Sequence, residues 1–303
     1  WCKAIEERKA WVLADAGFDM DLDGADSHSV QYQNANNSVR LSDEFMEAVE
    51  SDAEWALRSV ATGEVLRTVR ARELLHQIAE AAWECADPGV QFSSTINRWH
   101  TASVTGPINA SNPCSEYLHL DDSACNLASL NLLSFLDEHG EFDIDGFAHA
   151  VNITLIAQEI LVGNADYPTE AIGETTRRFR QLGLGYANLG ALLMALGLPY
   201  DSEAGRAWAG SITALMTGAA YRTSAHLAGR LGPYAGFAEN REPQLGVLRA
   251  HRKALAGLST LQSSTALNAA AAAAWDEAIE MGDRVGVRNA QVSVLAPTGT
   301  ISF

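Results

Sequence analysis

The sequence predicts a globular protein of the α/β class, and three observations support that prediction. The 303 residues are 47% apolar and 19% charged, a composition sufficient to bury a large core. Strand-like and helix-like patterns are mixed along the whole chain. The chain contains no internal repeat and no long linker. We therefore expect residues 1–303 to belong to one α/β domain.

The first third of the chain is predicted to combine helices with a short hairpin. The sequence SDEF at Ser42 is similar to a capping box, in which a serine side chain accepts a hydrogen bond from the first turn of a helix. Alternating residues on either side of ATGE predict two antiparallel strands. The expected elements are a helix at 4–14, a glycine- and aspartate-rich turn, a strand at 29–41, a helix at 42–49, a hairpin at 55–69 and a helix at 73–85.

The remainder of the chain is predicted to be mainly helical, with two strand-like segments. ACNLASLNLLSF, residues 124–135, is one strand-like run, and AQVSVLAPTGTISF, residues 290–303, is a strand that ends in a turn. The glycines of GLGYANLG have the wrong spacing for a dinucleotide-binding loop, so close helix packing is the favoured interpretation of Gly183, Gly185 and Gly190. Helices are expected at 145–163, 175–196, 203–231 and 265–281, the last of which contains an alanine tract.

Composition excludes several classes of function. The formal charge of −17 argues against nonspecific binding to nucleic acid or to an anionic membrane. Four cysteines without CxxC spacing, and eight histidines without an HExxH pair, argue against a zinc site and a disulfide scaffold. No apolar run is as long as a bilayer span, and no signal peptide is visible. A reducing cytoplasm is the expected location.

The stretch NPCSEY, residues 112–117, places an amide, a thiol and a carboxylate at alternate positions. In an extended segment Asn112, Cys114 and Glu116 would project to the same side, about 7 Å apart. Pro113 disfavours the helical region for the residue before it, which supports an extended backbone. Taken alone, the pattern is more often a loop that holds a buried, inert cysteine than a reactive site.

The turn at Pro297, Thr298, Gly299, Thr300 and Ile301 is a second chemical candidate. A glycine between two hydroxyl residues allows backbone N–H groups and side-chain hydroxyls to converge on an anion. Without further support, a turn after a strand is usually only a turn.

A resemblance changes the weight of both motifs. GPINASNPCSEYLHLDDSACNLASLNL, residues 106–132, resembles the catalytic finger-loop segment of ribonucleotide reductase large chains, and most of all the adenosylcobalamin-dependent class. The resemblance extends over essentially the whole chain, including QYQNANNSVRLSDEFM and QLGLGYANLGALLMALGLPYDSEAGR. It implies a ten-stranded α/β barrel of the ribonucleotide reductase and glycyl-radical type with a catalytic finger loop. Neither end of the chain has the character of a natural terminus, so residues 1–303 are expected to be the central part of an incomplete barrel.

The resemblance also implies a role for each residue of the two motifs. Cys114 is expected to carry a transient thiyl radical that removes the 3′ hydrogen of the ribose, Glu116 to take the proton of the 3′ hydroxyl, and Asn112 to hydrogen-bond the ribose. Pro113 and Ser115 complete this substrate-binding loop. PTGTI, residues 297–301, is expected to hold the substrate phosphates.

The other cysteines and two histidines also receive an interpretation, which for Cys125 follows from the resemblance. Cys125 is expected to supply reducing equivalents together with a cysteine from an earlier strand, which would lie before residue 1. Cys2 and Cys85 occur in helix-like runs and are expected to be structural. His100 and His119, which flank the thiol motif, are interpreted as structural histidines rather than proton carriers.

The implied function is an oxidoreductase, a vitamin B12-dependent ribonucleoside-diphosphate reductase that makes 2′-deoxyribonucleotides for DNA synthesis. Its cofactor would be adenosylcobalamin, its reductant a thioredoxin-like or small dithiol, and its effectors nucleotides that bind mostly through an upstream region. The level of substrate phosphorylation and the oligomeric state stay open, with a homodimer among the options. Two alternatives are an oxygen-dependent reductase whose radical comes from a separate subunit, and a noncatalytic nucleotide-binding fragment.

Overall fold

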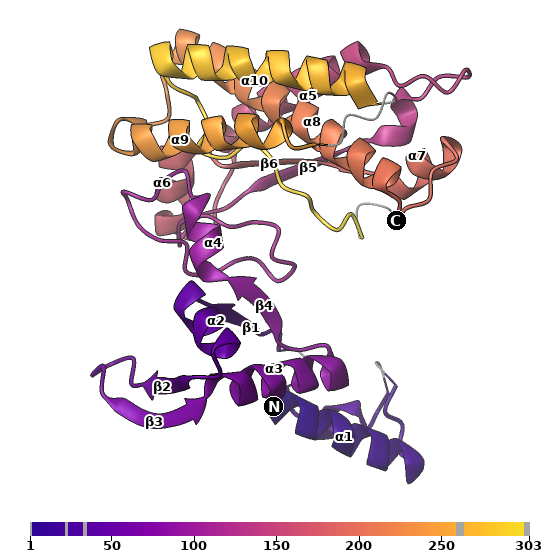
Figure 1. The fold of residues 1–303 in the computed structure, drawn as a ribbon, viewed down its shortest axis with the longest axis vertical. Coiled ribbons are helices and arrows are strands. Elements are labelled where there is room, and N and C mark those ends of the chain that lie inside the picture. Colours follow the sequence, from indigo (N-terminus) through magenta and orange to yellow (C-terminus); the bar gives the residue numbers. More distant parts are fainter. Residues whose placement is uncertain (1, 22–23, 33–34, 259–263, 300–303) are drawn as a thin grey trace. The chain divides into compact units, whose positions relative to one another are not determined.

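The computed structural model describes residues 2–21, 24–32, 35–258 and 264–299. The chain divides into two compact units, residues 1–98 and residues 99–303 (Figure 1). Each has its own small sheets and its own apolar core, and each is described here by itself.

The first unit contains two small sheets and a modest core. β1 pairs in parallel with β4, and β2 pairs antiparallel with β3, with a register shift between Leu57 and Arg58. Its core is formed by Leu41, Phe45, Val49 and Ala71. The elements are α1 (Cys2–Asp15), a 3-10 turn (Ser27–Ser29), β1 (Ser38–Leu41), α2 (Asp43–Glu50), β2 (Glu54–Arg58), β3 (Val65–Arg70), α3 (Ala71–Cys85), β4 (Gly89–Phe92) and α4 (Ser93–Arg98).

Most predictions for this unit are confirmed. The helix expected at 42–49 is α2, and the Ser42 side chain accepts a hydrogen bond from the backbone N–H of Phe45 at 3.2 Å. The hairpin and the helices expected at 4–14 and 73–85 are also present. The strand expected at 29–41 is wrong in extent, because only residues 38–41 pair with another strand. Before them, the N–H groups of Gln31 and Asn37 donate to carboxylates instead of to a neighbouring strand.

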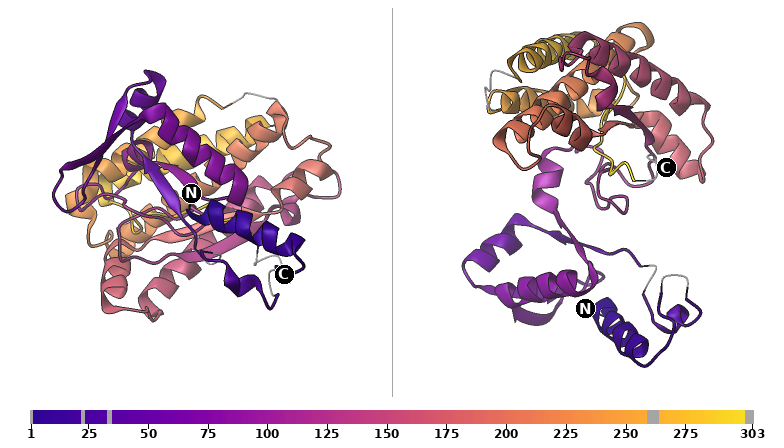
Figure 2. Two further views of the ribbon diagram at one scale, coloured as in Figure 1. Left: turned by 90° about the horizontal axis from the view of Figure 1, so that it is seen from below. Right: turned by 90° about the vertical axis from the view of Figure 1, so that its right-hand side faces the viewer.

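The second unit packs its helices against a parallel sheet. β5 pairs in parallel with β6, and α5 contacts both strands. α8 packs against α5 and α10, and these three helices lie on one side of the sheet (Figures 1 and 2). The elements are β5 (Asn126–Asn131), a 3-10 turn (Leu132–Phe135), α5 (Ile144–Asn164), α6 (Glu170–Phe179), β6 (Leu182–Ala187), α7 (Leu189–Ala195), α8 (Glu203–Leu231), α9 (Phe237–Leu255) and α10 (Thr265–Val285).

A third extended segment, residues 291–294, lies along the other edge of β6. The N–H of Leu184 donates to the carbonyl of Val292 at 3.1 Å, and the N–H of Val294 donates back to Leu184 at 3.0 Å. The bridge between Leu184 and Ser293 is parallel. This segment confirms part of the strand expected at 290–303, of which residues 300–303 lie outside the described part. The carboxyl ends of all three segments therefore meet at one edge.

The helix expected at 175–196 is wrong, because this stretch forms α6, β6 and α7. α6 ends where Arg180 adopts a left-handed conformation with φ of 53°. The sequence suggested that Gly183 and Gly185 allow close packing of helices. This is wrong, because both glycines lie within the strand β6. A Cβ built on Gly185 would lie 2.5 Å from the carbonyl oxygen of Val294, so glycine is required for the close approach of residues 291–294.

A buried polar network ties these elements together. The Glu159 side chain on α5, which is only 5% exposed, accepts hydrogen bonds from Arg180 at 2.6 Å and from Arg288 at 2.7 Å. Its second oxygen accepts a bond from Asn289 at 2.7 Å, and Asn289 in turn bonds Ser224 on α8. Because the carboxylate has partners for both oxygens, the charge is compensated within the core.

Helix α5 is long and apolar enough to cross a membrane by length and composition alone, the one such helix in the part of the chain that is described. The sequence-based expectation concerned an uninterrupted apolar run, whereas α5 includes Asn152, Gln158 and Glu159 among its apolar residues. Gln158 and Glu159 in the middle of this helix are buried and hydrogen-bonded to β5 and to Arg180. These contacts give α5 the character of a core helix of the second unit.

Candidate active site

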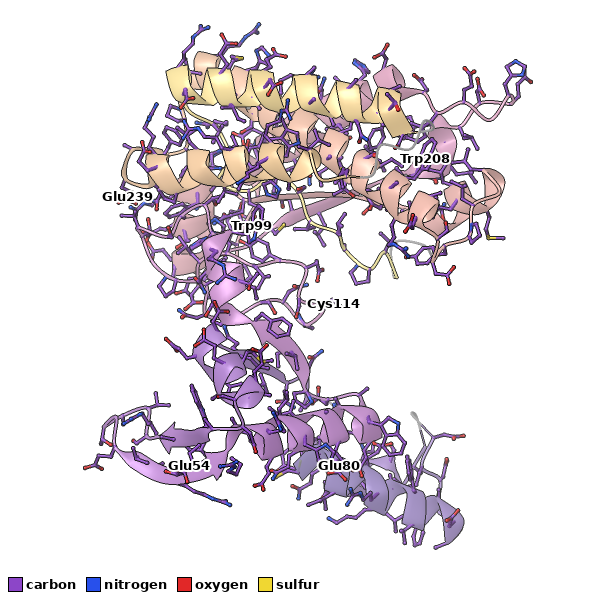
Figure 3. All side chains as sticks on the ribbon, in the orientation of Figure 1. Glu54, Glu80, Trp99, Cys114, Trp208 and Glu239 are labelled. Carbon is purple, nitrogen blue, oxygen red and sulfur yellow. The ribbon has the colours of Figure 1, made fainter. Side chains whose placement is uncertain are left out.

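Cys114 lies at a tight turn in the loop between α4 and β5 (Figure 3). The backbone N–H of Ser115 donates to the carbonyl of Asn112 at 3.0 Å, and Ser115 has φ of 62°. The predicted extended backbone is therefore wrong. The fixed φ of Pro113, which disfavours helix, also suits the second position of a β-turn. The turn leaves Cys114 exposed, with a free thiol.

The side-chain amide of Asn112, two residues before Cys114, is bonded within the loop. The Asn112 side-chain oxygen accepts a hydrogen bond from the N–H of Tyr117 at 3.0 Å, and the Tyr117 hydroxyl bonds Ser123 at 2.8 Å. Farther out, Asn109 donates to Asp121 at 2.9 Å. The loop is thus closed on itself by side-chain bonds on both sides of the thiol.

Glu116 and Cys125 form the second part of the site. One carboxylate oxygen of Glu116, Oε2, is buried and has no hydrogen-bond partner among the described residues. Burial, followed by the negative charge of Glu116, raises the pKa of the Cys125 thiol to about 12. The two side chains are therefore within electrostatic reach of each other, and Cys125 is a protonated thiol at neutral pH.

Contacts from three elements hold Cys125 in place at the start of β5. The N–H of Ala124 donates to Thr176 on α6 at 2.9 Å, and Gln158 on α5 donates to the carbonyl of Asn126 at 2.7 Å. The thiol lies directly over Gly183 of β6, where a built Cβ would be 2.4 Å from Sγ. Sequence reasoning found Cys125 but missed these supports, because a threonine and a glutamine within helices give no chemical signal.

The candidate phosphate turn follows the segment 291–294 at the carboxyl edge of the sheet. Thr298 has φ of 56°, and its hydroxyl donates to the carbonyl of Pro297 at 2.7 Å. Among the described residues, a Cβ built on Gly299 would meet no atom within 4 Å, so these residues leave space beside it. Thr300 and Ile301, the other two predicted residues, lie outside the described residues.

The structure therefore brings together some of the predicted residues and not others. It places Glu116 near Cys125, and it places Pro297, Thr298 and Gly299 at the edge where the parallel segments end. Cys114 is presented on its own turn. Within the described residues, no group of three or more His, Cys, Asp or Glu side chains is arranged to hold a metal ion.

Comparison with known proteins gives a consistent result. Residues 20–303 match the family described as "Ribonucleotide reductase, barrel domain". The vitamin B12-dependent ribonucleotide reductases of Streptomyces clavuligerus and Rhodopirellula baltica are 55% and 50% identical to the chain, over 99% and 100% of its length. The vitamin B12-dependent ribonucleoside-diphosphate reductase of Mycobacterium tuberculosis is 32% identical over 88% of the chain. The chain spans about a third of these relatives, with 32%, 29% and 33% of their lengths covered.

Proposed function

Because the chain belongs to the ribonucleotide reductase barrel-domain family, we propose that the protein containing it reduces ribonucleotides to 2′-deoxyribonucleotides through a thiyl radical. The observation that carries the proposal is the arrangement of Cys114, Glu116 and Cys125. An exposed thiol stands two residues from a half-buried carboxylate, and that carboxylate lies within electrostatic reach of a buried, protonated thiol. Diphosphates are the proposed substrates, in line with the name of the relative from Mycobacterium tuberculosis.

Each side chain has a defined part in the proposed reaction. The Cys114 thiyl takes the hydrogen atom from C3′, which restores its S–H bond and leaves a carbon radical. Glu116 accepts the proton of the 3′ hydroxyl as general base and returns it when the 3′ oxygen is reprotonated, and the 2′ hydroxyl leaves as water with a proton from one thiol of the reducing pair. Cys114 finally returns a hydrogen atom to C3′, which regenerates its thiyl. Asn112, Pro113 and Ser115 form the wall of the turn that faces the ribose.

Cys125 and a second thiol outside this chain supply the two electrons. Both thiols lose their hydrogens and form a disulfide, which a thioredoxin-like protein or a small dithiol then reduces. The raised pKa of Cys125 supports this role, because a protonated thiol can deliver hydrogen together with its electron.

The phosphates are assigned to the turn at residues 297–301. Open space beside Gly299 and the position of the turn at the carboxyl edge of parallel strands both favour an anion there. The three parallel segments of the second unit are proposed to be part of a ten-stranded barrel, with the loop around Cys114 as its finger loop.

Adenosylcobalamin, when bound, supplies the radical that oxidises the thiol. The exposure of Cys114 at the tip of its turn fits an oxidant that arrives from outside the loop.

The test uses the full-length protein with dithiothreitol and either CDP or CTP, with and without adenosylcobalamin. We expect cofactor-dependent formation of the deoxynucleotide that is lost in Cys114→Ser and retained in Cys2→Ser, the matched change at another exposed cysteine. Product that requires a second protein instead of cobalamin would assign the protein to the oxygen-dependent class. Nucleotide binding without reduction, unchanged in Cys114→Ser, would identify a noncatalytic binding protein.

A further inference from the structure

Two buried histidines lie at the base of the loop that carries Cys114. His100 precedes the loop and His119 follows Glu116 by three residues, and each is only 3% exposed. Their rings meet edge to face, with centroids 5.1 Å apart and an interplanar angle of 87°. The two ends of the loop are therefore joined by one imidazole pair.

Hydrogen bonds fix the tautomer of His100. Nδ1 accepts a bond from the N–H of Ala102 at 3.4 Å, so Nε2 carries the proton and donates to the carbonyl of Gly106 at 3.0 Å. Burial lowers the pKa of His100 to about 4, which keeps the ring neutral at physiological pH. Through these two bonds the ring holds the start of the loop.

His119 connects the other end of the loop to β6. The side-chain amide of Gln181, which is fully buried, donates to Nδ1 of His119 at 3.0 Å. The ring also contacts Phe179, with centroids 5.9 Å apart. Burial, followed by the neighbouring His100, lowers the pKa of His119 to about 3. Gln181 directly precedes Leu182, the first residue of β6.

β6 thereby determines the position of both halves of the site. Gln181 holds His119, which is three residues from Glu116, and Gly183 lies against the thiol of Cys125. The two contacts come from positions two residues apart, one directly before β6 and one within it. A strand has few accessible conformations, so this arrangement keeps the carboxylate and the thiol in a fixed relation to each other.

We propose that His119 and Gln181, together with His100, are positioning residues for the reductase site, setting the loop of Cys114 and Glu116 relative to Cys125. The inference rests on the proposed function for its catalytic consequence. The role is to orient and not to transfer protons, because both rings stay neutral. His100 bonds backbone groups at both nitrogens and His119 bonds Gln181 through Nδ1, while the buried Nε2 of His119 has no hydrogen-bond partner among the described residues.

Kinetics of the full-length protein test the catalytic consequence. His119→Leu removes the acceptor and leaves the buried amide of Gln181 without its partner, whereas His119→Asn keeps an acceptor near the position of Nδ1. We expect kcat to fall by about tenfold or more in His119→Leu, because small displacements at a reacting centre have effects of that order. KM for the nucleotide should change by less than about twofold, since the phosphate turn is separate. His119→Asn should recover most of kcat, and the exposed control His139→Leu should retain all of it.

Loop protection tests the inference independently of activity. Limited proteolysis within residues 106–118 should be several-fold faster in His119→Leu than in the wild type, and near the wild-type rate in His119→Asn. If His119→Leu does not fold, Gln181→Met removes the same hydrogen bond with nearly the same volume and should show the same two effects. Wild-type kcat and wild-type proteolysis in Gln181→Met or His119→Leu would overturn the inference. A wild-type protein without reductase activity, but with faster loop cleavage in the variants, would refute the proposed function and keep the loop-setting role.

Discussion

Gly183 is the position where one added methyl group should disturb the site most directly. In Gly183→Ala the new Cβ would lie 2.4 Å from Sγ of Cys125, 2.7 Å from Leu127 and 3.0 Å from Val294. Ordinary contacts begin at 3.4 Å, so the sulfur has to retreat by 3.4 minus 2.4, or about 1 Å. Overpacking of this kind costs about 1–3 kcal/mol, and here it is concentrated on the proposed reducing thiol.

The assay is the rate at which a thiol reagent labels Cys125 in the folded, full-length protein, followed by mass spectrometry. The thiol must become exposed before it reacts, so a loss of about 1–3 kcal/mol in local stability raises labelling by about 5- to 150-fold. Gly190→Ala is the matched control, because its built Cβ meets no atom within 4 Å and alanine favours the helix α7. Equal labelling of Cys125 in the Gly183 variant, the Gly190 variant and the wild type would refute the reasoning.

Three further predictions concern the contacts that support the two units. Glu159→Gln should lower the free energy of unfolding by about 3 kcal/mol, because Arg180 and Arg288, both mostly removed from solvent, lose the carboxylate that balances their charge. A change below about 0.5 kcal/mol in denaturant unfolding would show that solvent compensates the two guanidinium groups. Burial lowers the folded pKa of His100 to about 4 and that of His119 to about 3, both below the ordinary 6.5. Unfolding therefore takes up protons on acidification, and stability falls from pH 6.5 down to about pH 4 through His100 and down to about pH 3 through His119. For His100, the drop in pKa from 6.5 to about 4 corresponds to about 3 kcal/mol of stability. His119→Asn removes the second buried histidine, so its thermal midpoint should decline less steeply with acidification than that of the wild type. Parallel plots of thermal midpoint against pH for the two proteins would contradict the assignment. Ser42→Ala should lower the stability of α2 by about 1 kcal/mol, because it removes the side chain that accepts a hydrogen bond from the N–H of Phe45. The loss should be detectable as faster amide hydrogen exchange in α2, and unchanged exchange would show that the cap contributes nothing.

Elements with strong local signals could be predicted from the sequence. α2 begins at a serine cap, and α8 occupies residues 203–231 as expected. α9 was not predicted, because Pro243 stands inside it and indicates a break. The structure accommodates this with a non-helical conformation at Asn240, whose buried side chain accepts bonds from two backbone N–H groups of the loop after α4. Only tertiary contacts reveal that stabilisation.

The strand β6 and the turn at Cys114 could not be predicted either, because contacts distant in sequence or the turn's own hydrogen bond determine their backbone. LGLGYA has two glycines, no β-branched residue and one strand-favouring residue, Tyr186, so local propensity gives only a weak strand signal. It becomes a strand because β5 and residues 291–294 pair with it on both sides. Near Cys114, Pro113 excludes a helix but is compatible with both an extended segment and a turn. The hydrogen bond from the N–H of Ser115 to the carbonyl of Asn112 shows that the chain forms the turn.

The proposed reactive residues Cys114, Glu116 and Cys125 could be assigned through the resemblance of residues 106–132, because the thiol pattern alone agrees with an inert cysteine. Gln181 and Gly183 carry no such signal, since they meet the site only through the position of β6 in the folded unit. Gln181 directly precedes β6 and Gly183 lies within it, so the loop and the thiol share one support. The backbone on either side of Cys125 is also bonded to Thr176 on α6 and to Gln158 on α5, which fixes the thiol against these helices. A shift of β6 against the helices would therefore change the separation between the carboxylate and the thiol, so the geometry of the site depends on how β6 packs against α5 and α6.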